Sequence, residues 1–170
     1  VLDHTSSAMG ARLMRKWLLM PLLDVTKIKA RHDMTDWFLQ HETTTLEVDS
    51  YIKQIGDLER IVSKVAMEKI NPREVLQLKK ALEMTMPIRE LLMQSANTAL
   101  VRLAEQLNPC PSAIQLMSQA IDAEAPALLG KGDTINAGYN EELDELRHII
   151  RNSKELLLEV QQKEIERTGI

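Results

Sequence analysis

Apolar residues recur along most of this chain at spacings of three and four positions, the period of one face of an α-helix. The longest such stripe lies near the C-terminal end and consists of Leu143, Leu146, Ile150, Leu157 and Val160. An asparagine at position 140 is a suitable N-cap, four carboxylates follow it within five residues, and a glycine at position 169 is a suitable stop. The pattern predicts one uninterrupted helix over about 140–168, a rod of roughly 40 Å.

Shorter stretches with the same period precede this helix, and capping or helix-breaking residues bound each of them. They predict helices over about 5–21, 24–40, 45–54, 57–65, 71–107 with a break or kink at Pro87, and 112–123. Residues 126–136 show little periodicity and could form a small hairpin or an ordered loop. The predicted fold is all-α: an irregular multi-helix bundle over 1–139, followed by a second domain, the long helix, in 140–170.

Composition and charge exclude several classes of protein. A net charge of −4 and an aromatic content of 3% do not suit a module that binds nucleic acid by itself. The only cysteine, Cys110, cannot form an internal disulfide and is typical of a reducing compartment. No apolar run is long enough to cross a bilayer and no leader is evident, so we expect a cytoplasmic or nuclear protein. Three cations in the first predicted helix are interpreted as a solvated face: Arg12, Arg15 and Lys16.

Three features could carry chemistry, and each has a simpler interpretation. The glycine-rich segment 130–134 lacks the G-x-x-x-x-G-K-[ST] spacing of a phosphate-binding loop, so we interpret it as a turn. Glu145 and His148 form one Glu-x-x-His pair, whereas a di-iron bundle needs two such pairs and two further glutamates. Cys110 has no nearby histidine to activate it and is interpreted as a half-buried thiol. No catalytic residue, cofactor site or metal site is therefore assigned.

Three stretches of the chain resemble one known family. The first runs from Leu-Asp-His-Thr at residue 2 through Met-Gly-Ala-Arg-Leu-Met-Arg-Lys-Trp-Leu-Leu-Met-Pro-Leu, which ends at residue 22. The second is Gly-Asp-Leu-Glu-Arg-Ile at 56–61 with Asn-Pro-Arg-Glu at 71–74. The third is Gly-Tyr-Asn at 138–140 with Glu-Leu-Asp-Glu-Leu-Arg at 142–147 and Glu-Arg-Thr-Gly-Ile at 166–170. In this order and spacing they are similar to the MutS family of DNA mismatch-repair proteins.

The resemblance implies that the chain is the core or lever domain of such a protein. Members of the family are dimers that bind mismatched duplex DNA, and they carry an ABC-type ATPase that uses ATP and Mg²⁺. The lever connects DNA recognition to the ATPase, and a clamp domain is inserted at its tip. The resemblance places the end of this sequence where the clamp would begin, so the clamp and a second lever helix would both lie beyond Ile170. The implied role is structural and allosteric, without chemistry in this part.

None of the family's best-known functional residues falls within the chain. The only candidates for a contact with nucleic acid are Lys163 and Arg167, near the expected clamp end. Two alternatives remain open: a stand-alone helical adaptor that binds a partner helix, and a metal-dependent bundle built around Glu145 and His148. Because the second lever helix would be missing, we expect the apolar stripe of residues 143–160 to be partly unpaired and to promote self-association.

Overall fold

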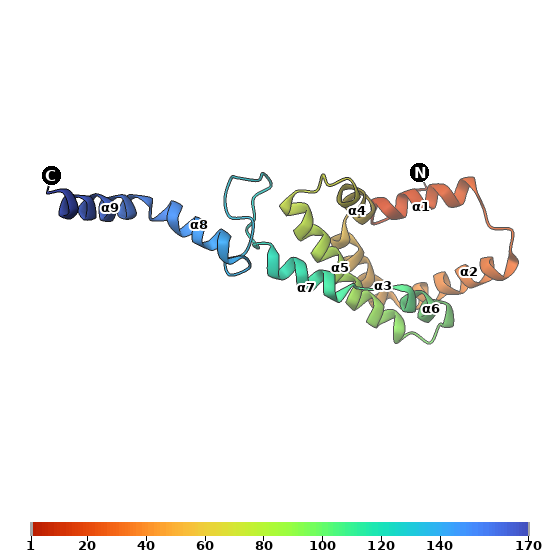
Figure 1. Ribbon diagram of the computed structural model, residues 1–170. Coiled ribbons are helices and arrows are strands. Elements are labelled where there is room, and N and C mark those ends of the chain that lie inside the picture. Colours follow the sequence, from red (N-terminus) through yellow and green to blue (C-terminus); the bar gives the residue numbers. More distant parts are fainter. Residues whose placement is uncertain (1, 170) are drawn as a thin grey trace. The chain divides into compact units, whose positions relative to one another are not determined.

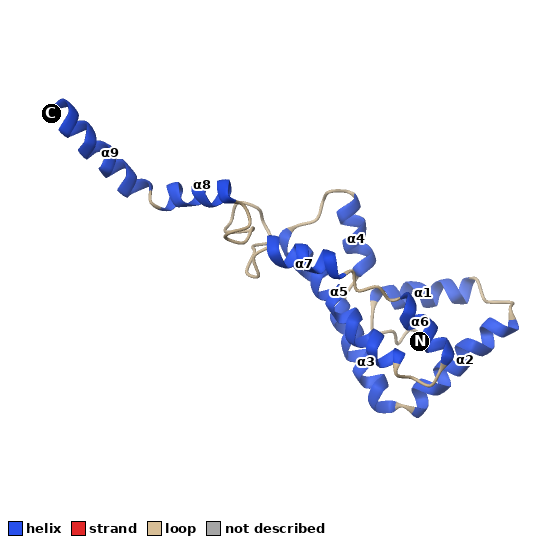
Figure 2. Cartoon of the chain, turned by 60° about the horizontal axis from the view of Figure 1, so that its bottom comes forward, coloured by secondary structure: helices blue, strands red, loops and turns tan. Residues whose placement is uncertain are grey.

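Every regular element of the chain is an α-helix in the computed structural model (Figures 1 and 2). The structure describes residues 2–169, without the side chains of 154–156. Within that part of the chain no strand occurs. The helices are α1 (Ala8–Leu19), α2 (Val25–Gln40), α3 (Glu42–Ile55), α4 (Leu58–Ala66), α5 (Pro72–Met93), α6 (Thr98–Gln106), α7 (Pro111–Ala120), α8 (Glu141–Arg151) and α9 (Ser153–Thr168). The predicted all-α, multi-helix fold is confirmed.

Several helices begin where the sequence supplies a capping side chain. The Ser7 hydroxyl accepts a hydrogen bond from the Gly10 amide at 3.1 Å and so begins α1. A reciprocal capping box begins α5, in which Asn71 accepts from the Glu74 amide at 3.0 Å and Glu74 accepts from the Asn71 amide at 3.2 Å. These bonds satisfy amides that have no partner inside a helix, which is why such residues mark helix starts.

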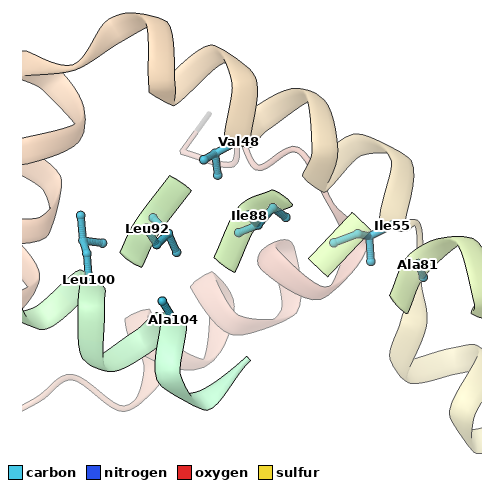
Figure 3. Packing of buried hydrophobic residues seen from close by; sticks show 7 residues of the cluster. All are labelled: Val48, Ile55, Ala81, Ile88, Leu92, Leu100 and Ala104. Carbon is cyan, nitrogen blue, oxygen red and sulfur yellow. The ribbon is translucent and has the colours of Figure 1, made fainter. Parts of the chain in front are cut away.

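The helix α5 is the centre of the core, and α3, α4, α6 and α7 pack against it. Side chains from α3, α5 and α6 meet there and are almost completely removed from solvent (Figure 3). The buried cluster consists of Val48, Ile55, Ala81, Ile88, Leu92, Leu100 and Ala104. Burial of this apolar surface is the main source of stability for the bundle.

The third helix is longer than predicted. It starts at Glu42 rather than near residue 45, so the three threonines at 43–45 lie within it. Thr45 does not interrupt the helix because its hydroxyl donates to two backbone carbonyls, that of Phe38 at 2.7 Å and that of His41 at 2.9 Å. A hydroxyl that finds such acceptors is compatible with a helical backbone.

The helix α5 continues through Pro87, so the chain is not broken there as one predicted alternative had it. Proline removes one amide donor, and this loss is tolerated here because Ile88 and Leu92 on the following turn are buried in the core. The predicted helix over 71–107 ends instead after Met93. Asn97 then begins α6 by accepting from the amides of the two residues at 99 and 100, at 2.9 and 3.1 Å.

The long C-terminal helix is not continuous, which corrects the prediction of one helix over 140–168. Its first part, α8, ends at Arg151, and α9 begins at Ser153. Asn152 between them has φ −102° and ψ 14°, outside helical geometry. Asparagine favours such positions because its side chain competes for local hydrogen bonds. The side-chain amide nitrogen of Asn152 lies 3.1 Å from Nδ1 and 3.3 Å from Nε2 of the His148 ring.

Residues 126–136 form a loop, and no strand is described within them, so of the two predicted alternatives the structure has the loop. The Asp122 amide donates to the Thr134 carbonyl at 2.9 Å and closes this loop at its base. Gly130 and Gly132 have φ values of 79° and 157°, and other residues rarely adopt the first of these.

The chain divides into two compact units, Val1–Thr134 and Ile135–Ile170. The first holds α1 to α7 and the buried cluster. The second holds α8, α9 and the segment that leads into α8. Each unit is described by itself below, and a functional division at residue 139 stays a prediction.

Candidate functional site

The start of α8 is fastened to the segment that precedes it. Asn140 caps the helix by accepting from the Leu143 amide at 2.8 Å. One turn further on, Asp144 accepts a hydrogen bond from the Gly138 amide at 2.6 Å. Gly138 has φ 82°, a conformation that glycine adopts without strain, and this lets its amide face the carboxylate.

Arg147 completes this connection. Its Nη2 donates to the Ile135 carbonyl at 2.9 Å, and its Nη1 donates to Asp144 at 3.3 Å. The Arg147 side chain is only 16% exposed, so these charge-assisted bonds are partly shielded from water. We call the four residues Ile135, Gly138, Asp144 and Arg147 the α8 collar. The collar makes residues 135–147 one hydrogen-bonded piece.

Beyond the collar, α8 and α9 expose apolar side chains rather than burying them. Ile150 is 72% exposed and Leu157 is 68% exposed. Among the described side chains of the two helices, the exposed large apolar residues are Leu146, Ile149, Ile150, Leu157, Leu158, Val160 and Ile165. The stripe predicted from the sequence is therefore largely unpaired in this structure.

The predicted contacts for nucleic acid lie one turn apart on α9, and both side chains are exposed. Arg167 pairs with Glu164 through Nη2 at 2.8 Å and Nε at 3.2 Å. Lys163 is the other candidate, and two acidic residues, Glu164 and Glu166, are its near neighbours in sequence. Alternating charge gives a weak attraction for a phosphate backbone. The role of this pair stays a prediction.

Ion pairs connect the first two stretches on which the family resemblance rests. Arg12 on α1 donates to both carboxylate oxygens of Asp57, at 2.6 and 3.0 Å, and to Glu59 at 2.8 Å. Asp57 also caps α4. The hydrogen bond from Arg12 holds the pKa of the Asp57 carboxyl below its usual value, and the same bond raises the pKa of the guanidinium. The sequence had indicated only a solvated face for Arg12, and this contact was not predicted.

A second ion pair connects α4 to the start of α5. Lys64 donates to Glu74, the glutamate of the capping box. This bond, together with the one from the Asn71 amide, lowers the pKa of the Glu74 carboxyl. The ion pair thus links α4, which begins in the first half of the second stretch (56–61), to the start of α5 in its second half (71–74). Three acidic residues of the two halves, Asp57, Glu59 and Glu74, therefore form ion pairs with other parts of the fold.

The remaining candidates for chemistry are dispersed. Glu145 and His148 lie on the exposed side of α8, and the His148 ring contacts Asn152. Cys110 is half-buried and caps α7 with φ 51°, and its thiol lies 3.6 Å from the Asn108 carbonyl oxygen. Among the described side chains, no three His, Cys, Asp or Glu residues gather as they would around a metal ion.

Membrane insertion through a helix finds no support in the described residues. None of the helices there combines the length and the apolar character needed to cross a bilayer.

Comparison with known proteins identifies the family. A family model described as MutS domain III matches residues 1–167. The chain is 46% identical to the DNA mismatch repair protein MutS of Cytophaga hutchinsonii and 47% identical to that of Parabacteroides distasonis, over 170 residues in each case. The alignments cover 100% of this chain but 20% of each relative, so the chain spans about one fifth of their length. The chain belongs to the MutS family and corresponds to its domain III.

Proposed function

We propose that this chain is the lever of a DNA mismatch-repair protein and couples the binding of mismatched DNA to ATP hydrolysis. In this proposal the chain performs no chemistry. It moves as a connected body between a part that holds DNA and a part that hydrolyses ATP. The relatives that carry the name DNA mismatch repair protein MutS, and the match to domain III over residues 1–167, support this assignment.

The α8 collar is the structural observation that favours mechanical transmission. A displacement of α8 toward its N-terminal side must pass through the backbone that precedes the helix. The bonds of Arg147 to Ile135 and Asp144, and of Asp144 to Gly138, give it a direct path. Hydrogen bonds to charged groups contribute roughly 1.5–3 kcal/mol each when water is partly excluded, enough to keep the segment and the helix together.

The substrate and cofactors belong to other parts of the proposed protein. Mismatched duplex DNA, ATP and Mg²⁺, and the dimer partner would all bind outside this chain, in the regions that make up the rest of the relatives' length. Lys163 and Arg167 are the only residues here to which we assign a contact with DNA, and that contact would be to phosphates. Such a protein would work where DNA is replicated, in the bacterial cytoplasm or the nucleus.

The test uses the full-length protein that carries this chain, with Arg147→Gln. We expect ATP hydrolysis without DNA, and affinity for mismatched DNA, to remain within about twofold of wild type. The change in ATP hydrolysis caused by mismatched DNA should fall by at least about fivefold, the lower end of typical coupling between sites. Glu145→Gln is the matched control because Glu145 is an exposed charged residue on the same helix, outside the collar.

Two results would count against the proposal. An unchanged response to mismatched DNA in Arg147→Gln, with the collar shown to be open by hydrogen exchange at Gly138, would remove the collar from the transmission path. A full-length reading frame without an ATPase would remove the lever function itself. The exposed stripe on α8 and α9 would then favour the adaptor, which holds an amphipathic helix of another protein.

A further inference from the structure

The joint between α8 and α9 is a single residue. Asn152 ends one helix and starts the next, and the ribbon changes direction there in both views (Figures 1 and 2). The backbone amide of Asn152 still donates to the His148 carbonyl at 2.9 Å, so the helical hydrogen bonding of α8 continues up to this point. On the other side, α9 begins without a hydrogen bond from a capping side chain.

The described apolar side chains on either side of this joint are not buried. Ile149 and Ile150 precede it with exposed fractions of 52% and 72%, and Leu157 and Leu158 follow it with 68% and 64%. Where a kink is enforced by a protein core, the apolar residues on both sides are buried. Here the described apolar side chains on both sides are exposed, so burial in a core does not enforce the backbone conformation of Asn152.

We infer that Asn152 is a hinge at which α8 and α9 exchange between a bent form and a continuous helix. Asparagine is less favourable than alanine inside a helix by less than about 1 kcal/mol, so the local preference that opposes a continuous helix is small. Residues 148 and 152 lie one turn apart, so the contact between the Asn152 side-chain amide and the His148 ring is compatible with either form.

The hinge adds a property to the proposed lever. A helix that bends at residue 152 transmits motion along the axis of α8 but absorbs part of a sideways displacement at its far end. Its consequence for the coupling of DNA and ATP rests on the proposed function. The existence of the bent and straight forms does not, because it is a property of this chain alone.

The hinge can be measured as a distance across the joint. Spin labels at Glu145→Cys and Glu159→Cys, in a chain with Cys110→Ser, are separated by 14 residues. A continuous helix of that length spans about 21 Å along its axis, and any bend shortens the separation. Double electron–electron resonance should give two populations for the otherwise unchanged chain. Asn152→Ala should shift them to one population at the longer distance.

A control variant makes the result specific. Asn140→Ala makes the same substitution outside the labelled span, so it should leave the distances unchanged. Identical single distances for the parent chain and Asn152→Ala would overturn the hinge. These measurements use neither DNA nor ATP, so their failure is distinct from a failure of the lever function.

Discussion

Leu100 is the residue whose truncation should cost this fold most. It is fully buried, with an exposed fraction of 0%, and it lies in the cluster that joins α6 to α5. Leu100→Ala removes three carbon atoms from a site whose neighbours, among them Leu92 and Ala104, are themselves almost completely buried. Because the surrounding helices are held by other contacts, they cannot close over the space, and a cavity remains.

The magnitude follows from burial and from the size of the unit. Truncation of a buried leucine to alanine lowers the free energy of unfolding by about 2–5 kcal/mol, and we take about 3 kcal/mol here. The first unit has 134 residues. At about 2.1 cal/mol/K per residue, its unfolding entropy near the midpoint is about 0.28 kcal/mol/K. The expected decrease in Tm is therefore about 11 °C.

Urea and thermal unfolding provide the measurement, with the fluorescence of Trp37 as the probe because this ring packs against the cluster. Leu103→Ala is the matched control, since it makes the same truncation on the same helix at a position that is 45% exposed. We expect a loss below about 1 kcal/mol for the control. Equal losses for the two variants, or a loss below about 1 kcal/mol for Leu100→Ala, would refute the assignment of the core to this cluster.

Three further predictions concern the charged and apolar surfaces. Removing the partner of Asp57 with Arg12→Gln should flatten the acid dependence of stability. The pKa of Asp57 is lower in the folded protein than the value of about 4 expected in the unfolded chain, so ionised Asp57 stabilises the fold above about pH 4. This contribution is lost as the pH falls through the pKa of the folded state. Urea midpoints from pH 7 to pH 2 measure the loss. Leu157→Glu should leave a monomer in sedimentation velocity if the exposed stripe drives self-association, and an unchanged association state would exclude the stripe as the cause. Replacing Lys163 and Arg167 by glutamine in the full-length protein should reduce the slope of log affinity for DNA against log salt by about 0.9 for each phosphate that the two cations neutralise, and an unchanged slope would show that neither residue binds a phosphate.

Helix starts could be predicted from the sequence because a cap needs only neighbouring residues. The box of Asn71 and Glu74, and the caps at Asp24 and Asn140, use side chains that reach amides two or three residues away. All the residues that form such a cap lie close together in the sequence. A cap can therefore be predicted without knowing how the helices pack.

Helix ends were harder to predict. Pro87 is the strongest breaking signal in the interior of a predicted helix, yet α5 continues through it, while helices end at Met93 and Arg151. The reason is the size of the energies involved. Propensity differences among most residues are below about 1 kcal/mol, and burial of the next turn after Pro87 exceeds the loss of one hydrogen bond. At Asn152 no burial opposes the local preference.

The sequence marked the region of the candidate site without specifying its contacts. The collar residues Gly138, Asp144 and Arg147 all lie in the third stretch that resembles the MutS family, and that resemblance assigned them no roles. Arg147 binds the carbonyl of a residue 12 positions earlier, in a segment without periodicity. Arg12 and Asp57 are 45 positions apart. Contacts at such separations depend on the path of the chain between them, which no local pattern specifies.

The collar and the joint at Asn152 give α8 unequal ends. At its start, bonds from Asn140, Asp144 and Arg147 hold the helix to its own preceding backbone. At its other end α8 stops at Arg151, and α9 begins without a hydrogen bond from a capping side chain. A load applied through α9 would therefore bend the joint before it loosened the collar. If the chain works as a lever, its stiff length ends at residue 151, and stiffening Asn152 should strengthen rather than weaken the response of ATP hydrolysis to DNA.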